Sequence, residues 1–207
     1  MNEMIIPTPR GDIYGLAAGP EDGPVVIGIH GWSQRNGAHT WAPLVEPLGT
    51  AGYRAIAVAM PGWGDSPKWE KASGKPVVGG KSAVIAILDS LGVETAHALM
   101  GKSWGGGVSL DFALTHPARV NKLILTAPAY RGELADLTQR LTTPVLLTWA
   151  KNDQVIPINF GMGIAEAIVD CQFEIYDEGG HEAAQHNVAD FAPKAISFLR
   201  KQKREKR

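Results

Sequence analysis

Short apolar runs alternate with segments of helical periodicity along the chain from about residue 25 onward. Most of the runs are nearly continuous in valine, isoleucine, leucine and alanine, which is typical of strands buried on both faces of a parallel sheet. Between them, apolar residues recur at helical spacing, and in KSAVIAILDSLG the final Gly92 acts as a helix stop signal. The runs predicted as strands are VVIGIH (25–30), RAIAVAM (54–60), AHALM (96–100), KLILTAP (122–128), PVLLTWA (144–150) and QFEIYDE (172–178).

The alternation of strands and helices predicts an α/β fold with a mostly parallel central sheet and helices on both faces. The opening segment MIIPTPRGDIYGLAAG (4–19) predicts an antiparallel hairpin at one edge of that sheet. Helices are predicted over residues 38–51, 81–91, 105–116, 131–140, 160–169 and 187–201.

The chain is predicted to form a single domain over residues 1–207, because it contains no internal repeat, low-complexity tract or linker and its length suits one core. Residues 61–80, PGWGDSPKWEKASGKPVVGG, form the longest irregular stretch. Loops of this length are commonly functional or mobile. The sequence does not decide the oligomeric state.

Hydrophobic residues make up 44% of the chain and charged residues 20%, which excludes a disordered polymer. No apolar run approaches the roughly 18 residues that a membrane span requires. The opening residues lack the basic and apolar regions of a signal peptide. The single cysteine, Cys171, excludes an internal disulfide framework and suits a reducing compartment. We therefore expect a cytoplasmic protein.

The charge of the chain is unevenly distributed. Residues 200–207, RKQKREKR, carry six basic side chains and one acidic one, whereas the whole chain has a formal net charge of −1. The remaining chain is therefore acidic and offers no second basic patch, so we expect a frayed end after the last helix and no nucleic-acid partner.

The stretch GKSWGGG (101–107) fits two kinds of site. A phosphate-binding P-loop requires a first glycine five residues before the last one, and that position is Ala96, inside a predicted strand. A second Gly-Lys-Ser, at 80–82, fails in the same way because Lys75 occupies the required position. The P-loop interpretation is therefore rejected.

The alternative is a nucleophile elbow, the sharp G-x-S-x-G turn between a strand and a helix that exposes a serine. Here AHALM leads into the turn and VSLDFALTHP (108–117) leads out with a helical pattern. Gly101 and Gly105 flank Ser103 and keep side chains out of the crowded turn. Ser103 is thus the candidate nucleophile.

With this turn the chain resembles the α/β-hydrolase family. Its small size resembles, more loosely, the lidless members of the α/β-hydrolase-domain-containing protein 14 group. The resemblance implies an acid and then a histidine after later strands. Asp153 follows PVLLTWA in KNDQVIP, and His181 follows QFEIYDE in EGGHEA. The loop PGWGDS (61–66) also matches the family pattern. The predicted catalytic triad is Ser103, Asp153 and His181.

Other histidine and aspartate residues are alternatives for the same roles. His186 is the rival base, but it should already enter the last helix. Asp177 is too close to the histidine along the chain, and Asp136 lies in a predicted helix. Asp65 is interpreted as a turn residue and Cys171 as a core residue.

The resemblance also implies an oxyanion hole formed by the backbone N–H groups of Trp32 and Trp104. Several aromatic residues fall in or beside the loops expected to surround the site, which favours an apolar or aromatic pocket. The predicted substrate-binding residues are His30, Gly31, Trp63 and Trp149.

These residues predict a serine hydrolase that cleaves an ester or thioester through an acyl-enzyme, without a cofactor or metal. Only residues 129–143 separate two predicted strands where many relatives insert a lid, so an open site is expected, suited to small esters or to acyl groups on a larger partner. Acyl transfer to another acceptor, and a binding module with slow or no turnover, are the alternatives.

Overall fold

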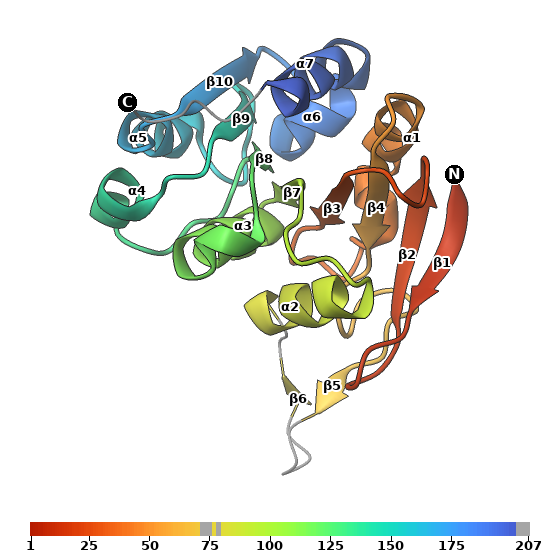
Figure 1. The fold of residues 1–207 in the computed structure, drawn as a ribbon. Helices are drawn as coiled ribbons and strands as arrows, with labels where there is room; N and C mark the ends of the chain where they lie inside the picture. Colours follow the sequence, from red (N-terminus) through yellow and green to blue (C-terminus); the bar gives the residue numbers. More distant parts are fainter. Residues whose placement is uncertain (71–75, 78–79, 202–207) are drawn as a thin grey trace.

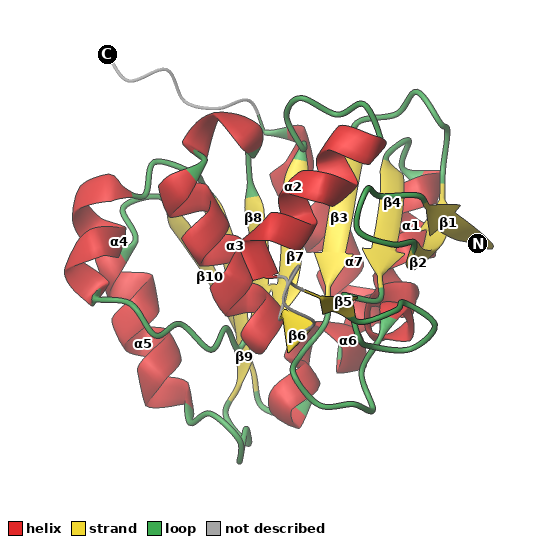
Figure 2. Ribbon diagram, turned by 90° about the horizontal axis from the view of Figure 1, so that it is seen from below, coloured by secondary structure: helices red, strands yellow, loops and turns green. Residues whose placement is uncertain are grey.

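The structure is a computed structural model that describes residues 1–70, 76–77 and 80–201. Its centre is an eight-stranded sheet in the order β1-β2-β4-β3-β7-β8-β9-β10. Figures 1 and 2 show the fold from two directions. β1 and β2 form an antiparallel hairpin at one edge, and all neighbours from β4 to β10 run parallel. The strands are β1 (Asn2–Ile6), β2 (Ile13–Ala18), β3 (Val25–Ile29), β4 (Arg54–Val58), β7 (Ala98–Lys102), β8 (Leu123–Thr126), β9 (Val145–Ala150) and β10 (Cys171–Tyr176).

Helices cover both faces of the sheet (Figure 2). One face carries α1 (Ala42–Thr50), α6 (Ala183–His186) and α7 (Val188–Arg200). The other carries α2 (Gly80–Ser90), α3 (Trp104–Thr115), α4 (Leu134–Arg140) and α5 (Ile158–Ala167). Short 3-10 turns are η1 (Ala38–Trp41), η2 (Pro117–Arg119) and η3 (Gly180–Glu182).

The core has two layers because side chains of a strand alternate between the faces of the sheet. Within β3, Val26 packs among the residues of the α1 and α7 side, whereas Ile27 packs among those of the α2 and α3 side. Gly28 leaves room for Trp41, since a Cβ there would lie 2.9 Å from the indole ring. The Trp41 indole N–H donates to the carbonyl of Ile29 at 2.9 Å. This contact fixes the end of β3, after which the site begins.

The predicted α/β-hydrolase fold is confirmed, including the hairpin at the sheet edge. Most predicted boundaries shift by one to four residues, and two of the differences affect the region of the site. β7 starts at Ala98 and continues through Gly101 and Lys102, so the strand runs into the elbow itself. α2 begins at Gly80 and β5 (Trp69–Glu70) pairs with β6 (Pro76–Val77), which shortens the predicted irregular stretch 61–80. Residues 71–75 and 78–79 of that stretch lie outside the described residues.

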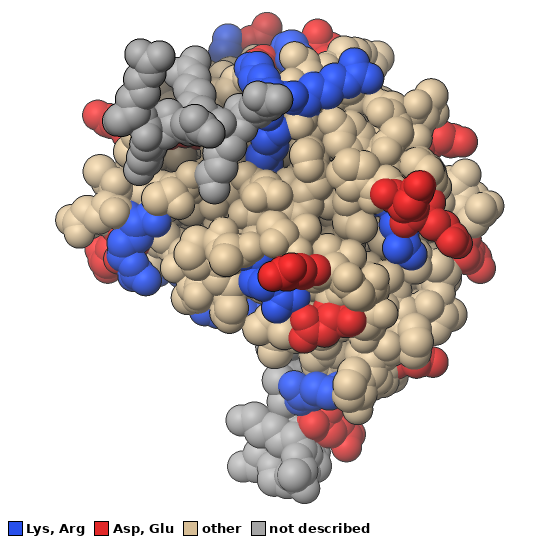
Figure 3. All heavy atoms as spheres, in the orientation of Figure 1, with Lys and Arg blue, Asp and Glu red and all other residues tan. Residues whose placement is uncertain are grey.

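No lid domain is inserted between β8 and β9, because residues 127–144 contain α4 and no other helix or strand. On the face shown in Figure 3, basic side chains lie among acidic ones and most of the surface is uncharged. Six residues of the predicted basic tail, 202–207, lie outside the described residues. No helix in the described part of the chain is long and apolar enough to cross a membrane. The single-domain boundary 1–207 stays a prediction.

Candidate active site

Ser103 lies in a strained turn between β7 and α3. Its φ of 53° is positive, a conformation that residues with a Cβ adopt at a cost. The flanking glycines are required sterically: a Cβ on Gly101 would lie 2.5 Å from the Gly105 carbonyl oxygen, and one on Gly105 would lie 2.4 Å from the Ile29 carbonyl oxygen. The carbonyl of Ser103 itself accepts the N–H of Ala129 at 2.8 Å. The turn is therefore held rigidly with the serine side chain half-buried at its tip.

Asp153 lies in the loop after β9 with a fully buried side chain. Its Oδ1 accepts the N–H groups of Val155 at 2.8 Å and Ile156 at 3.0 Å. Its Oδ2 lies 2.8 Å from Nδ1 of His181, which follows β10 in η3. Both carboxylate oxygens are thus engaged, and the carboxylate is aimed at the histidine.

The hydrogen bond to Asp153 assigns the tautomer of His181. A carboxylate accepts hydrogen bonds only, so Nδ1 carries the hydrogen and Nε2 presents a lone pair. His181 Nε2 is buried and has no hydrogen-bond partner among the described residues. No hydrogen bond joins it to Ser103 in the described chain, as is common in free enzymes, where catalytic hydrogen bonds tighten on substrate binding. Nε2 is therefore the imidazole nitrogen whose lone pair is free to accept a proton.

The serine and histidine loops are tied together directly. Lys102, immediately before Ser103, forms an ion pair with Glu182, immediately after His181. The contact joins residues that are 80 positions apart in the chain. The structure therefore brings the predicted nucleophile and base to the same end of the sheet.

His30 shapes the neighbouring loop. The register that pairs Ile29 with Gly101 places residues 30–32 alongside the elbow. His30 is fully buried; its Nε2 accepts the Met60 N–H at 3.0 Å, so its Nδ1 donates to the Gly31 carbonyl at 2.7 Å. Burial lowers the pKa of His30 to about 4, so the ring is neutral at pH 7.

The hydrogen bond from His30 to the Gly31 carbonyl affects the orientation of Trp32 N–H, one of the two predicted oxyanion donors. In a trans peptide the N–H points opposite to the preceding carbonyl, so fixing the Gly31 carbonyl also aims the N–H of Trp32. The N–H of Trp104 is the first of α3, where helix N–H groups have no partner within the helix and the dipole favours negative charge. The assignment of both groups to an oxyanion hole remains a prediction.

Three tryptophans pack together beside Ser103. The rings of Trp63 and Trp104 stack at 5.2 Å, and Trp32 meets both edge-on, at 5.2 Å and 5.5 Å. The Trp63 indole N–H donates to the Trp32 carbonyl at 3.0 Å, which holds the loop that follows β3. Trp32 is the exposed member, at 53%.

A hollow of about 530 Å³ opens next to Ser103. Its walls are mainly apolar, and two exposed charged side chains join them. The lining residues are Trp32, Ser103, Trp104, Gly107, Val108, Asp111, Ala129, Arg131, Val155 and Ile156.

Some of these lining residues were missed in the sequence. Gly107, Val108 and Asp111 follow Trp104 at spacings of three, four and seven, so they share one face of α3. This helical spacing from Trp104 could have predicted from the sequence that they lie beside the site. Arg131 carried no such signal, because it stands in a loop.

Three predicted substrate-binding residues need correction. Trp149 is fully buried in the core, its indole N–H donating to the Ile156 carbonyl at 2.9 Å, so it holds the Asp153 loop and does not line the hollow. His30 is fully buried as well and acts on the loop backbone. Trp63 is 4% exposed and lies behind Trp32. Gly31 lies in the loop that follows β3, with Ser103 beside it.

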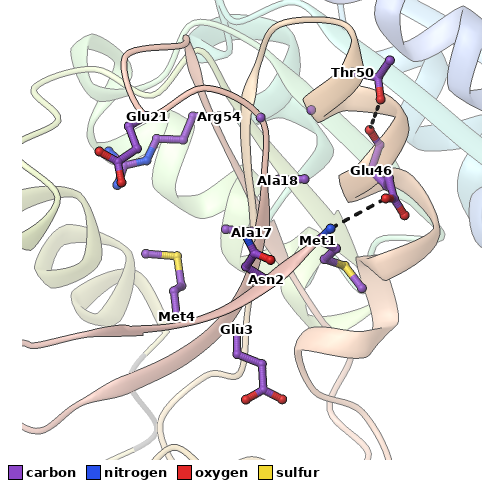
Figure 4. A pocket seen from close by; sticks show the side chains of 12 residues that line it. Met1, Asn2, Glu3, Met4, Ala17, Ala18, Glu21, Glu46, Thr50 and Arg54 are labelled. Atoms are coloured by element: carbon purple, nitrogen blue, oxygen red, sulfur yellow. Dashed lines mark hydrogen bonds and ion pairs between the residues drawn. The ribbon is translucent and has the colours of Figure 1, made fainter.

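Two larger hollows, each of about 600 Å³, lie away from Ser103. Figure 4 shows the one between the N-terminal hairpin and α1, where the Met1 amino group lies 3.6 Å from a Glu46 carboxylate oxygen. The other adjoins Lys122 and Cys171. Neither contains a nucleophile beside an oriented base, so size alone does not identify the site.

The rival residues lie elsewhere. His186 ends α6, and Asp136 sits in α4, paired with Arg140. Asp177 is exposed and pairs with Lys151 at 2.6 Å. Burial raises the pKa of the Cys171 thiol to about 11, which leaves it protonated and unreactive at pH 7. In the described chain, no three His, Cys, Asp or Glu side chains gather as metal ligands.

A doubly covered parallel sheet with a serine elbow and a carboxylate–histidine pair beyond its strand ends defines a hydrolase class. The family described as the alpha/beta hydrolase fold matches residues 24–140, and the chain belongs to that family.

Relatives extend the similarity to nearly the whole chain. The 2-hydroxy-6-oxononadienedioate/2-hydroxy-6-oxononatrienedioate hydrolase of Cupriavidus pinatubonensis is 24% identical over 252 aligned positions, covering 84% of this chain and 86% of the relative. The 2-hydroxy-6-oxo-6-phenylhexa-2,4-dienoate hydrolase of Comamonas testosteroni is 24% identical, with 86% and 88% covered. A crystal structure described as a CIB-like hydrolase from Thermoplasma acidophilum superposes with a TM-score of 0.85 at 24% identity, covering 96% of this chain and 97% of that one. This structural likeness shows the fold.

Proposed function

We propose that the protein is a serine hydrolase that cleaves carboxylic esters or thioesters through Ser103, His181 and Asp153. The observation that carries the proposal is the orientation of His181. Its Nδ1 is held by a buried carboxylate while its Nε2 is buried and unpartnered among the described residues, and its loop is bonded to that of Ser103. This is the arrangement that a general base for a serine nucleophile requires.

The reaction follows from these groups. His181 Nε2 accepts the Ser103 hydroxyl proton as the oxygen attacks the carbonyl carbon. The carbonyl π electrons move to the oxygen, which the N–H groups of Trp32 and Trp104 stabilise by roughly 3 kcal/mol per donor. Collapse of the adduct breaks the bond to the leaving group, which takes the proton from His181. Water then repeats the sequence and releases the acid.

The hollow next to Ser103 supports an apolar or aromatic group on the substrate. Trp32, Trp104, Val108 and Ile156 are among the apolar residues of its wall, and a volume of about 530 Å³ suits a small molecule. Because no lid is inserted between β8 and β9, the hollow opens to solvent. We therefore propose small esters or thioesters of apolar acids as the substrate class.

The first test is labelling with a fluorophosphonate probe, comparing the wild type with Ser103→Ala and mapping the adduct by mass spectrometry. We expect one adduct, on Ser103, and its loss in the variant. A series of p-nitrophenyl esters of increasing chain length then reports the acyl preference. A folded wild type that neither labels nor hydrolyses any of these esters would contradict the proposal and favour a binding module on the same fold.

A second candidate is cleavage of a carbon–carbon bond next to a carbonyl, as the names of the two relatives indicate. The alignment of 252 positions exceeds the 207 residues of this chain, so the relative carries inserted residues that this chain lacks. The substrate 2-hydroxy-6-oxo-6-phenylhexa-2,4-dienoate distinguishes the two: decay of its visible absorbance with the protein, and not with Ser103→Ala, would favour this candidate.

A further inference from the structure

Lys102 is an unusual residue for its position, because it is 4% exposed although lysine is rarely buried. A buried ammonium group requires partners that offset the loss of hydration. Its Nζ donates to the Glu182 carboxylate and, at 3.4 Å, to the Asn36 side-chain oxygen. One ammonium group thus links the elbow, the histidine loop and the loop that follows β3.

These contacts assign the orientation of the Asn36 amide. Lysine Nζ can only donate, so Asn36 must present its oxygen to it. The Thr40 hydroxyl donates to the same oxygen at 3.3 Å. The amide nitrogen of Asn36 is consequently turned away from Lys102 and Thr40.

The nitrogen lies on the same side of Gly31 as Ser103. A Cβ placed on Gly31 would lie 3.3 Å from Asn36 Nδ2 and 3.4 Å from Ser103 Cβ, so the amide and the serine flank the same glycine. Gly31 precedes Trp32, whose N–H is a proposed oxyanion donor. Within the described residues, no acceptor takes a hydrogen bond from Asn36 Nδ2.

We infer that Asn36 Nδ2 is a third donor to the oxyanion, beside the N–H groups of Trp32 and Trp104, and that Lys102 is the positioning residue that aims it. The inference rests on the proposed function of Ser103. When the Ser103 oxygen bonds to the carbonyl carbon, the electron pair displaced onto oxygen accepts the Asn36 N–H. The proton passes to His181 as before, so Asn36 changes no proton count and stabilises charge only.

Two variants remove the donor in different ways. Asn36→Asp keeps the shape and the oxygen that faces Lys102, whereas Asn36→Leu keeps the approximate volume without polar atoms. With p-nitrophenyl butyrate we expect kcat to fall about 10²- to 10³-fold, the range for loss of one side-chain oxyanion donor, with KM changed less than about threefold. Gln34→Ala, an exposed neighbour in the same loop, is the matched control and should retain wild-type kinetics.

A tetrahedral mimic separates this role from a structural one. Phenylboronic acid forms a tetrahedral adduct with an active serine, so its Kd should rise at least about tenfold in Asn36→Leu. A residue that only supports the loop would instead raise KM and lower the melting temperature. Circular dichroism melts of each variant verify that the fold is intact.

The role of Lys102 is tested by a double-mutant cycle. Lys102→Met should lower kcat because the amide loses its anchor, and Lys102→Arg should recover part of the loss by restoring a donor. If Lys102 acts through Asn36, the pair Lys102→Met and Asn36→Leu together should be no slower than Asn36→Leu alone. Additive losses would overturn the positioning role.

The outcomes separate the inference from the function on which it rests. A wild type that labels at Ser103, together with an Asn36→Asp variant whose kcat stays within twofold, overturns the inference alone. A wild type without labelling or ester hydrolysis overturns both. Slower labelling of both Asn36 variants with unchanged melting temperatures supports it.

Discussion

Nδ1 of His181 lies 2.8 Å from Oδ2 of Asp153, whose side chain is fully buried beneath it. The other oxygen of the carboxylate accepts two backbone N–H groups of its own loop. The aspartate therefore cannot turn away from the imidazole without losing two further hydrogen bonds. This pair decides which imidazole nitrogen is free, and the first prediction tests it.

Asp153→Asn is expected to lower kcat for p-nitrophenyl butyrate by about 10⁴-fold, as in related triads. The amide NH₂ donates to Nδ1, which places the histidine hydrogen on Nε2, where it cannot accept the serine proton. Steady-state kinetics give the measurement, and Asp177→Asn, at an exposed carboxylate, is the control. Equal rates for the two variants would contradict the role of Asp153.

The strained turn at Ser103 predicts a difference in stability between two inactive variants. Glycine tolerates a positive φ, whereas alanine retains the strain that serine has. Ser103→Gly should therefore be more stable than Ser103→Ala by about 1 kcal/mol. Urea unfolding of the two proteins measures the difference, and a more stable alanine variant would show that the turn is not strained.

His30 predicts a dependence of stability on pH. Its pKa is lowered from 6.5 to about 4 by burial, so the unfolded chain binds the proton more readily than the folded one. The contribution of neutral His30 to the free energy of unfolding is fully present above pH 6.5. It is lost as the pH falls towards 4, by up to about 3 kcal/mol. His97, whose pKa burial also lowers, adds in the same direction.

The measurement for His30 is the free energy of unfolding between pH 7 and pH 4. His30→Gln should be less stable at pH 7, because it loses the bonds to Met60 and Gly31, but its stability should fall less steeply with decreasing pH. Parallel slopes for the two proteins would show that His30 does not resist protonation.

Two glycine substitutions should change stability in opposite directions. Gly105→Ala places a Cβ 2.4 Å from the carbonyl oxygen of Ile29, at the end of β3, and should cost more than about 2 kcal/mol. Gly163→Ala, in α5, places its Cβ 3.7 Å from Leu134 and should stabilise the protein by about 0.5 to 1 kcal/mol through helix propensity. Thermal melts compare both with the wild type, and a neutral Gly105→Ala would show that the elbow can relax.

The sequence was sufficient to predict the strands and the strand-to-helix turn at Ser103, because these depend on local periodicity or on a short motif. The structure pairs Asp153 with His181, and the catalytic roles of the three residues stay predictions. The sequence was insufficient to predict the burial of Trp149. Periodicity does not distinguish a tryptophan that lines a site from one that packs in the core, and Trp149 packs against Gly161 of α5. The sequence was also insufficient for Lys102. Only the folded chain brings Glu182 to it, and lysine next to a nucleophile otherwise suggests an exposed residue.

The connection between β8 and β9 contains only α4, so it is a place where a further domain can be inserted. Ala129 must keep its hydrogen bond to the Ser103 carbonyl, but Arg131 and the start of α4 that follows are exposed. A cap domain grafted after Arg131 would cover the hollow while the strands that precede Ser103, Asp153 and His181 stay in register. On the proposed function, the residues that select a substrate can therefore be changed separately from those that react with it.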